Sequence, residues 1–459
     1  MKILLAHGYF IHEDKTEQEV MRPYPPLGLL YVSGYLQSKG IGHEVFDGTF
    51  SSFEKLIKQL KTQKPDLIAM YANFLTRINV VKIINKIRET PEIAGMKIVL
   101  GGPDVRYHQE EYLGSGADFL VLGEGEITLY ELIEAIRQKK DFRQIPGMVF
   151  RADDEMVIHT GERNHLSKLD ELPLPNREKI DMRLYLDAWK EKHGYHSVTI
   201  NTQRGCPYTC RWCSHAVFGD TYRRRSPAHV VDEIELLKQK YNPDSFWFVD
   251  DVFTMSEKWI REFENALSER EISISYECIT RADRLNDDVL TSLKNTGCRL
   301  LWIGAESGSQ NVIDRMDRRV DVLRVREMIK KAKNLGIETG TFIMLGYPGE
   351  TKEDIQETIR HLQDCQPDQF TINLAYPIKG TKLYDEVAEK ITNGNAWPEP
   401  IDRDIDFKRT YRRPFYEMAI RKVYNEVFFQ KQMRDREYLK ALISKAKSLA
   451  ASVGMQVMK

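Results

Sequence analysis

Three cysteines lie close together in one short segment of the chain. Cys206, Cys210 and Cys213 are spaced C-x3-C-x2-C within the run Arg-Gly-Cys-Pro-Tyr-Thr-Cys-Arg-Trp-Cys. Three thiolates on one loop favour a metal site over a disulfide, because they can bind three irons of a [4Fe–4S] cluster and leave the fourth iron open to a small ligand. The alternatives are three unrelated thiols or a zinc site. A zinc site normally requires a fourth protein ligand, which His215 is placed to supply.

The cysteine spacing resembles that of the radical S-adenosylmethionine (SAM) superfamily. The resemblance implies that the amino and carboxylate groups of SAM chelate the open iron. It also implies that Trp212, which precedes the last cysteine, lies against the adenine of SAM. The other cysteines, Cys278, Cys298 and Cys365, show no close spacing, so we expect a single cluster.

The first 140 residues alternate short apolar runs with amphipathic stretches. Strand followed by helix, repeated five times, predicts an α/β fold with a doubly wound, Rossmann-like parallel sheet. The predicted strands are Ile3–Ala6, His43–Phe46, Leu67–Tyr71, Ile98–Leu100 and Phe119–Leu122. Ligands of such sheets bind at the carboxyl ends of the strands. The candidate binding residues at those ends are His7, Gly8, Tyr9, Ala72, Asn73, Gly101, Gly102, Pro103, Gly123, Glu124, Gly125 and Glu126.

On the residues alone, this first domain leaves two interpretations open. The chain has no G-x-G-x-x-G after the first strand and no G-x-x-x-x-G-K-[ST] loop, which argues against a dinucleotide site and a phosphate-binding loop. The glycines at the strand ends therefore serve either a bulky ligand or only the tight turns between strand and helix.

Three segments of this domain resemble the cobalamin-binding domain that precedes many radical SAM domains. They are residues 24–31 (Tyr-Pro-Pro-Leu-Gly-Leu-Leu-Tyr), 101–103 and 123–126. The resemblance implies that the corrin and the nucleotide tail of cobalamin lie on the strand ends. The chain lacks the D-x-H-x-x-G motif in which a protein histidine ligates cobalt, as do most members of this class. We therefore expect cobalamin on residues 1–140 without a cobalt-ligating histidine, His7 included.

Residues 141–190 are polar and irregular. A short hairpin is predicted at Met148–Arg151 and Met156–His159, and the prolines of Leu169-Asp-Glu-Leu-Pro-Leu-Pro175 disfavour helix there. We expect a linker that runs over the surface between two domains.

From residue 191 to 385 the alternation of strand and helix returns with a longer period. Six β/α units predict a partial TIM barrel, whose working residues cluster at the carboxyl ends of the strands. The predicted strands are Ser197–Gln203, Ser245–Val249, Ser273–Cys278, Leu300–Ala305, Glu338–Leu345 and Gln369–Leu374. Each candidate residue at their ends, taken alone, is more often a capping acid or a turn glycine. Because such residues follow one predicted strand after another, together they indicate a binding site.

The resemblance assigns these strand ends to SAM. Arg281 suits a carboxylate, because its guanidinium forks onto two oxygens. In order along the chain, the resemblance implies contacts from Asp250 and Asp251 to the amino group, from Glu306 and Ser307 to the ribose hydroxyls, and from the backbone at Gly346 and Pro348 to the adenine. The acids at 250 and 251 depart from the Gly-Gly-Glu that the superfamily often has there.

Length and composition set the remaining bounds. A chain of 459 residues is too long for one hydrophobic core, so more than one domain is expected. Residues 386–459 are predicted to be helical and basic, and the family resemblance implies that they cap the barrel. A net charge of −1 gives no general case for nucleic acid or an anionic membrane as a partner. No apolar run reaches the ~20 residues of a membrane span. Six cysteines without a disulfide pattern favour the reducing cytoplasm.

The resemblance as a whole is to cobalamin-binding radical SAM enzymes, which include class B methylases and oxidative cyclases. It implies reductive cleavage of SAM to a 5′-deoxyadenosyl radical, hydrogen abstraction from an unactivated carbon, and methyl transfer from methylcobalamin. The alternative is cyclisation or ring rearrangement without methyl transfer. A small-molecule or peptide substrate and a one-electron donor such as flavodoxin or ferredoxin are the expected partners. The residues do not name the substrate, the oligomeric state, or what the C-terminal tail contacts.

Overall fold

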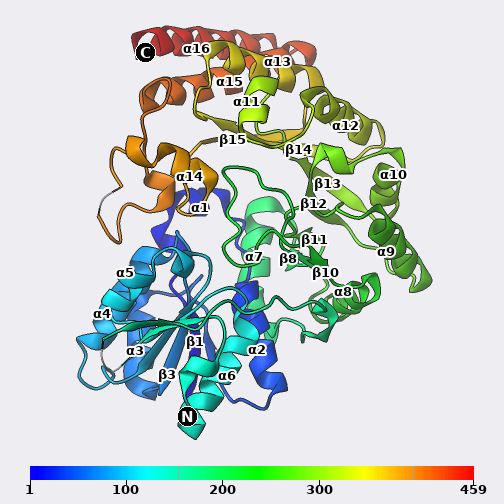
Figure 1. Cartoon of the computed structure of the whole chain (residues 1–459). Coiled ribbons are helices and arrows are strands. Elements are labelled where there is room, and N and C mark those ends of the chain that lie inside the picture. The colour runs from blue at the N-terminus through cyan, green and yellow to red at the C-terminus, as the bar shows by residue number, and fades with distance from the viewer. Residues whose placement is uncertain (153–154, 395, 459) are drawn as a thin grey trace.

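The protein consists of two large sheets with their helices and one short two-stranded sheet, followed by a helical C-terminal region (Figure 1). The computed structural model describes residues 1–152, 155–394 and 396–458. The first sheet occupies the lower part of the view in Figure 1, and the second sheet the upper part.

The first sheet has seven strands in the order β2-β1-β3-β4-β5-β6-β7. The first five strands of that order are parallel, and β6 and β7 are antiparallel. The order 2-1-3-4-5 is a doubly wound arrangement with its topological switch between β1 and β3, where such sheets bind ligands. The strands are β1 (Ile3–His7), β2 (Glu44–Phe46), β3 (Leu67–Tyr71), β4 (Lys97–Gly101), β5 (Phe119–Val121), β6 (Met148–Arg151) and β7 (Val157–His159).

Helices cover both faces of this sheet, which explains why its central strands are apolar throughout. In β1, Leu4 and Ala6 join the core under one set of helices, while Ile3 and Leu5 join the core under the other. The helices are α1 (Lys15–Val20), α2 (Leu27–Ser38), α3 (Phe53–Gln63), α4 (Arg77–Arg88), α5 (Gln109–Gly114) and α6 (Gly125–Gln138). Of these, α2 and α6 pack together, as do α3 and α4.

The predicted hairpin is present, and it extends the first sheet. β6 pairs antiparallel with β5, and β7 pairs with β6, so the sheet continues beyond residue 140 into the stretch assigned to a linker. The rest of that stretch leads to α7 (Met182–His193).

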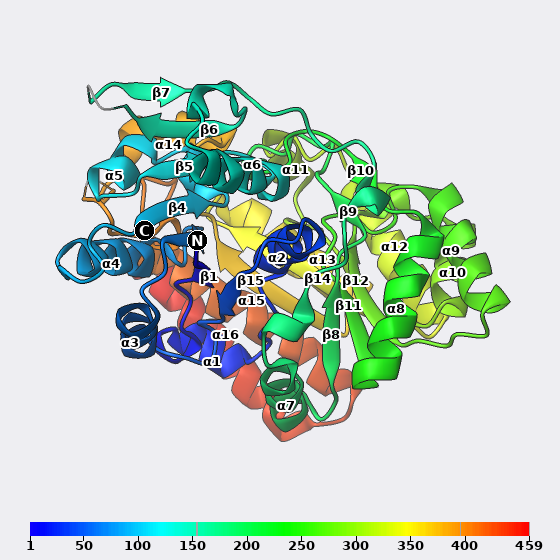
Figure 2. The same cartoon turned by 90° about the horizontal axis from the view of Figure 1, so that it is seen from below.

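The second sheet has six parallel strands in sequence order, β8-β11-β12-β13-β14-β15, as a partial TIM barrel requires. Figure 2 shows its helices along the outer side of the strands. The strands are β8 (Ser197–Ile200), β11 (Ser245–Phe248), β12 (Tyr276–Thr280), β13 (Cys298–Ile303), β14 (Glu338–Leu345) and β15 (Gln369–Leu374). The helices are α8 (Pro227–Tyr241), α9 (Glu257–Glu269), α10 (Asp287–Asn295), α11 (Gln310–Arg315), α12 (Val322–Asn334) and α13 (Lys352–Cys365).

The third barrel strand begins at Tyr276, three residues later than the apolar pattern predicts. The reason is steric. The carbonyl of Ile274 passes so close to Gly297 that a Cβ there would lie 1.9 Å from it, and pairing starts only after this crossing. Gly297 has a φ of +92°, which favours glycine.

The helical C-terminal region closes the far side of the barrel. α14 (Lys382–Val387) follows β15, and a long irregular stretch leads to α15 (Arg413–Arg434) and α16 (Tyr438–Val457). Phe415, Tyr416 and Val423 of α15 belong to the barrel core, whereas α16 packs along α15. Among the described residues, no helix is long and apolar enough to cross a membrane.

Candidate active site

The three predicted cluster cysteines lie on the loop between two short antiparallel strands, β9 (Gln203–Arg204) and β10 (Arg223–Arg224). Cys206 and Cys210 are buried, Cys213 is exposed, and all three are free thiols. Gly205 sets the direction of the loop. Its φ is +82°, and a Cβ there would lie 2.3 Å from the carbonyl oxygen of Thr221.

Two buried arginines converge on one of these cysteines. Nη1 of Arg281 lies 3.7 Å, and Nη1 of Arg318 3.9 Å, from Sγ of Cys210. Arg281 follows β12 and also donates to the carbonyl of Arg318 at 2.6 Å. The guanidinium of Arg318 lies 5.6 Å from the ring centre of Trp212. The two guanidinium groups place positive charge beside the sulfur of Cys210.

One cysteine of the loop and one strand-end acid are neighbours, and both are exposed. Cys213 and Asp251 are exposed, yet surrounding protein raises the pKa of both groups, that of Cys213 to about 12. Tyr24 of the first domain is 61% exposed and likewise has its pKa raised, first by burial and then by the charge of Glu17. Asp251 lies close enough to Cys213 for its charge to add to the rise in the pKa of the thiol.

The arrangement of the cysteines fits an iron–sulfur cluster better than zinc. One zinc ion with bonds of about 2.3 Å would bring its sulfurs within about 4 Å of one another. The sulfurs of the three cysteines do not come that close together. Among the described residues, only Asp104, His108 and Asp402 bring three candidate ligand atoms within 4.8 Å of one another. The three sulfurs are therefore spread more widely than one zinc ion requires. Nδ1 of His215, the alternative fourth ligand, pairs with Asp220.

The two acids after β11 have different surroundings. Asp250 is buried and accepts hydrogen bonds from the backbone of Thr202 at 2.7 Å and of Gln203 at 3.0 Å. Its carboxylate therefore holds the start of the cysteine loop. Asp251 is exposed and lies near Cys213, so it is the acid available to a ligand.

The segment after β13 sends one acid toward the cluster loop and its neighbours away from it. Glu306 has a φ of +65° and lies 3.4 Å from Arg318, and burial raises the pKa of its carboxyl. Ser307 is buried and 3.2 Å from the hydroxyl of Thr358 on α13. A Cβ at Gly308 would lie 2.5 Å from α13, so the backbone is packed directly on that helix.

The turn after β14 contains a buried carboxyl group. The N–H of Gly346 donates to Glu350 at 2.6 Å, while the other oxygen of Glu350 has no partner. Burial raises the pKa of Glu350 to about 8. Tyr347 packs in the small core that contacts Trp212. Pro348 faces outward and lines a cavity of about 660 Å³ with Arg409 and others; this cavity does not include the cysteines.

The turn after β4 in the first sheet leaves no room for a side chain at Gly102. Gly102 has a φ of +111°, and a Cβ there would lie 2.3 Å from the carbonyl oxygen of Ala72. The N–H of Ala72 donates to Gly101 at 2.7 Å, and Asn73 caps the following turn by accepting from Thr76 at 2.9 Å. Small residues and satisfied turns leave this edge open to a bulky ligand.

His7 and its neighbours are held within the domain. Nε2 of His7 lies 3.0 Å from Asp47, and Asp47 also accepts from Tyr185 at 2.8 Å. A Cβ at Gly8 would lie 3.3 Å from Cβ of Asn79 on α4. Burial, followed by the charge of Glu17, raises the pKa of Tyr9. Nε2 of His7 is thus engaged by the carboxylate of Asp47.

Glu124 and Glu126 contact the cysteine loop. Arg204 donates to Glu124 at 2.6 Å and to Glu126 at 2.5 Å, and all three side chains are buried. Arg223 also donates to Glu124, at 2.7 Å. Arg204 precedes Cys206 by two residues, so the first domain holds the base of the cluster loop. The glycines at 123 and 125 form the turn that presents these acids, with a φ of +80° at Gly123.

The carboxyl ends of the two sheets face each other. The ring of Phe74, just after β3, lies 6.2 Å from that of Tyr376, just after β15. Gly380, after β15, packs directly on the ring of Tyr107 after β4. Anything bound on the ends of one sheet therefore faces the ends of the other.

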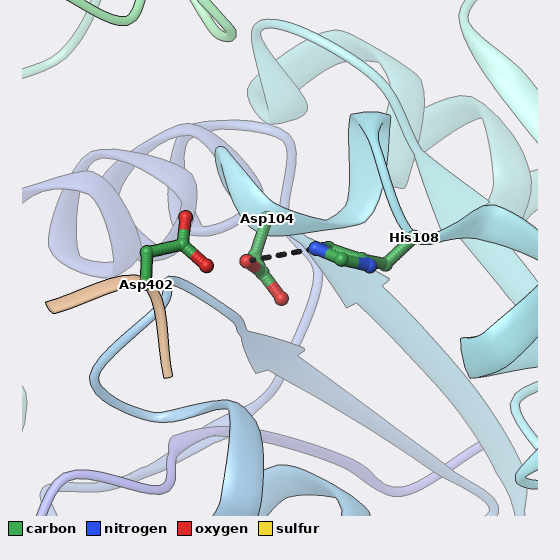
Figure 3. Close-up of side chains that lie close together, drawn as sticks. All are labelled: Asp104, His108 and Asp402. Atoms are coloured by element: carbon green, nitrogen blue, oxygen red, sulfur yellow. Dashed lines mark ion pairs between the residues drawn. The ribbon is translucent and has the colours of Figure 1, made fainter. Parts of the chain in front are cut away.

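A second cluster of possible metal ligands does not form a metal site. Asp104, His108 and Asp402 lie around a common centre (Figure 3). The guanidinium of Arg77 occupies that centre. Its Nη2 donates to Asp104 at 2.6 Å and to Asp402 at 2.7 Å, and it lies 3.1 Å from His108. This cluster joins the first domain to the stretch before α15.

Comparison with known families matches both halves of this arrangement. The radical SAM superfamily matches residues 200–362, and the B12 binding domain matches residues 18–133. The chain is a cobalamin-binding radical SAM enzyme. Its cofactors are a [4Fe–4S] cluster, SAM and cobalamin.

Three similar proteins span most of the enzyme. An uncharacterised methyltransferase of Pyrococcus horikoshii is 28% identical, over 84% of this chain and 83% of its own. The anaerobic magnesium-protoporphyrin IX monomethyl ester cyclase of Rubrivivax gelatinosus is 26% identical, over 96% and 81%. The radical SAM methyltransferase TsrM of Kitasatospora setae, solved with cobalamin and a [4Fe–4S] cluster, has a TM-score of 0.73 at 17% identity, covering 94% of this chain and 88% of that one.

Sequence reasoning missed three arginines of this enzyme. Arg318 lies in a loop after α11 rather than at a strand end, and Arg204 and Arg77 have partners more than 70 residues away. One signal was available for Arg204, because it directly precedes the cysteine motif. No local pattern marks the other two.

Proposed function

We propose that the enzyme transfers a methyl group to an unactivated carbon. One observation carries the proposal: the carboxyl ends of the B12-binding sheet and of the barrel face each other, with Phe74 and Tyr376 in contact across the boundary. A methyl donor on one side and a radical source on the other then meet at a substrate between them. The methyltransferase of Pyrococcus horikoshii, similar over most of both chains, supports the proposal.

In this proposal the cofactors generate the radical and donate the methyl group. The protein binds and orients the cofactors and excludes water from the site. Cys206, Cys210 and Cys213 hold the cluster. Arg281 and Arg318 supply positive charge beside Cys210.

Around SAM, we assign Asp251 to the amino group and Glu306 to the ribose hydroxyls. The backbone at Gly346 serves the adenine, and Trp212 packs beside it. Cobalamin lies on the backbone at Gly101–Pro103. A small electron carrier such as flavodoxin or ferredoxin supplies the electron.

Radical cyclisation is the second candidate. The cyclase of Rubrivivax gelatinosus matches 96% of this chain, which is more than the methyltransferase does. The aromatic rings of Phe74 and Tyr376 also lie where the ends of the two sheets meet, as a flat hydrophobic substrate would require. The two reactions differ in whether SAM must also methylate the bound cobalamin.

The deciding experiment needs no substrate. Anaerobic holoenzyme is reduced, given SAM with a deuterated methyl group, and the cobalamin is extracted for mass spectrometry. A methylating enzyme acquires the labelled methyl group on cobalamin, since it must reload its donor. Production of 5′-deoxyadenosine without label on cobalamin would favour the cyclase. The variant with all three cysteines changed to alanine should lose its iron and form no 5′-deoxyadenosine.

A further inference from the structure

The last helix, α16, has two apolar faces on opposite sides. The inner face packs on α15 through small residues and one methionine, namely Ala441, Ser444, Ser448, Ala451 and Met455. The outer face is exposed and carries large apolar side chains. They are Leu439 (74% exposed), Leu442 (66%), Ile443 (49%), Leu449 (58%), Val453 (60%) and Val457 (80%).

These exposed residues form one stripe along the whole helix. At 100° per residue the six positions fall within an arc of about 120°, which is a single side of the helix. α16 lies at the outermost edge of the molecule, beyond α15 (Figure 1). Single exposed leucines are common on proteins, but a continuous stripe of six large apolar residues marks an interaction surface.

The charges around the stripe are positive. α16 contains Lys440, Lys445 and Lys447 and no acidic residue between Tyr438 and Val457. At 100° per residue, Lys440 and Lys447 flank one side of the stripe and Lys445 the other. The whole stretch 412–458 holds ten lysines and arginines against four acids, in a chain whose net charge is −1. Lys440 pairs with Glu437 at 2.6 Å and Lys445 with Glu426 of α15 at 3.0 Å, so the excess of positive charge lies in the stretch as a whole and in Lys447 beside the stripe.

We propose that α16 docks the enzyme on the surface of an anionic lipid bilayer. An apolar stripe flanked by lysines is the arrangement of helices that lie in the plane of the membrane interface, with lysines among the headgroups. A second copy of the chain fits less well. A two-fold contact through this stripe would place the lysines of one α16 against those of the other, where like charges repel. Anionic headgroups neutralise the same lysines.

The test is flotation of the full-length holoenzyme with vesicles. Vesicles of phosphatidylcholine with 30% phosphatidylglycerol should float the enzyme, and vesicles of pure phosphatidylcholine should float it at least tenfold less. Raising the salt should weaken binding, because salt screens the lysines. Changing Lys440 and Lys447 to glutamine should weaken binding by about fivefold for each charge.

Changing Leu439 and Leu442 to serine should reduce binding to the anionic vesicles by tenfold or more. The matched control changes Leu184 and Leu236, which are 45% and 48% exposed on α7 and α8, to serine. This control should bind as the unchanged enzyme does. Both double variants should keep the same melting temperature, since all four leucines are exposed.

Three results would overturn the proposal. The first is equal binding by the Leu439/Leu442 variant and the control. The second is no binding to either vesicle. The third is a dimer by light scattering that the Leu439/Leu442 variant abolishes, without vesicle binding, which would make a second copy the occupant of the stripe. None of these results bears on methyl transfer, which is measured separately.

Discussion

At the scale of single residues, the proposed role of Cys210 as a cluster ligand implies that its surroundings control how easily the cluster is reduced. Arg281 and Arg318 are buried and approach its sulfur at 3.7 and 3.9 Å. Reduction adds negative charge to the cluster, and hydrogen bonds and positive charge near the sulfurs stabilise the reduced form. These arginines therefore raise the reduction potential that the electron donor must match.

We expect Arg318→Gln to make the cluster potential more negative by about 60 mV, a tenfold change in the one-electron equilibrium. Arg318→Lys should shift it less, because the charge remains. A redox titration followed by electron paramagnetic resonance measures both. The matched control is Arg319→Gln, since Arg319 is exposed and pairs with Asp317 on the surface. Equal shifts in the Arg318 and Arg319 variants would refute a specific role for Arg318.

Glu350 gives a pH dependence of stability. Burial raises its pKa to about 8, from 4.5, so between these values the folded protein binds a proton that the unfolded chain releases. Stability from this group is complete below pH 4.5 and is lost as the pH rises to about 8. The loss is about 1.4 kcal/mol per pH unit in that window. Glu350→Gln, which keeps the oxygen that accepts from Gly346, should remove this slope. Urea unfolding midpoints at pH 6, 7 and 8 would show it, and parallel curves for both proteins would contradict it.

At the scale of elements, the apolar periodicity of the sequence and the residues at the predicted strand ends were enough to predict the α/β architecture. The alternation of strand and helix predicted both parallel sheets, and the order of the barrel strands followed from it. The start of β12 was missed because it depends on the contact between Ile274 and Gly297, which lie 23 residues apart. Strand-end reasoning placed Glu124 and Glu126 at a functional edge, but it could not show that Arg204 binds both carboxylates. Partners distant in sequence leave no local pattern.

The turn after β4 gives a prediction for cobalamin. Gly102→Ala would place a Cβ 2.3 Å from the carbonyl oxygen of Ala72 at a φ that alanine rarely adopts, so the turn must move. We expect this variant to lose cobalamin, measured by absorbance of the bound cofactor, and to keep its iron. Gly95→Ala is the control, because a Cβ at Gly95 meets nothing within 4 Å. Retention of cobalamin by the Gly102 variant would place the cofactor elsewhere.

At the scale of the whole molecule, buried charges join segments distant in the chain. Arg77 on α4 links Asp104 of the same domain to Asp402 in the stretch before α15. A buried ion pair is weak evidence for net stability, but removing one partner leaves the others uncompensated.

We expect Arg77→Leu to lower the free energy of unfolding by about 3–5 kcal/mol and to expose residues around 402 to proteolysis. The control is Arg403→Leu. Arg403 lies in the same stretch and pairs with Asp14 at 3.3 Å, but its side chain is 36% exposed, so its loss should cost about 1 kcal/mol or less. Denaturant melts and timed digestion measure both effects. Similar losses in the two variants would mean that burial of the Arg77 cluster contributes nothing of its own.

The salt bridges from Glu124 and Glu126 to Arg204 also bear on biogenesis. The ribosome releases the first sheet before the cysteine segment, and domains fold as units during synthesis. Both carboxylates are therefore in position when Arg204 emerges, and the machinery that delivers iron and sulfide meets a loop whose base is already anchored. A gene without its first 140 codons should yield a barrel that acquires less iron per polypeptide than the complete enzyme. The order of the domains along the gene is then the order in which their shared site is assembled.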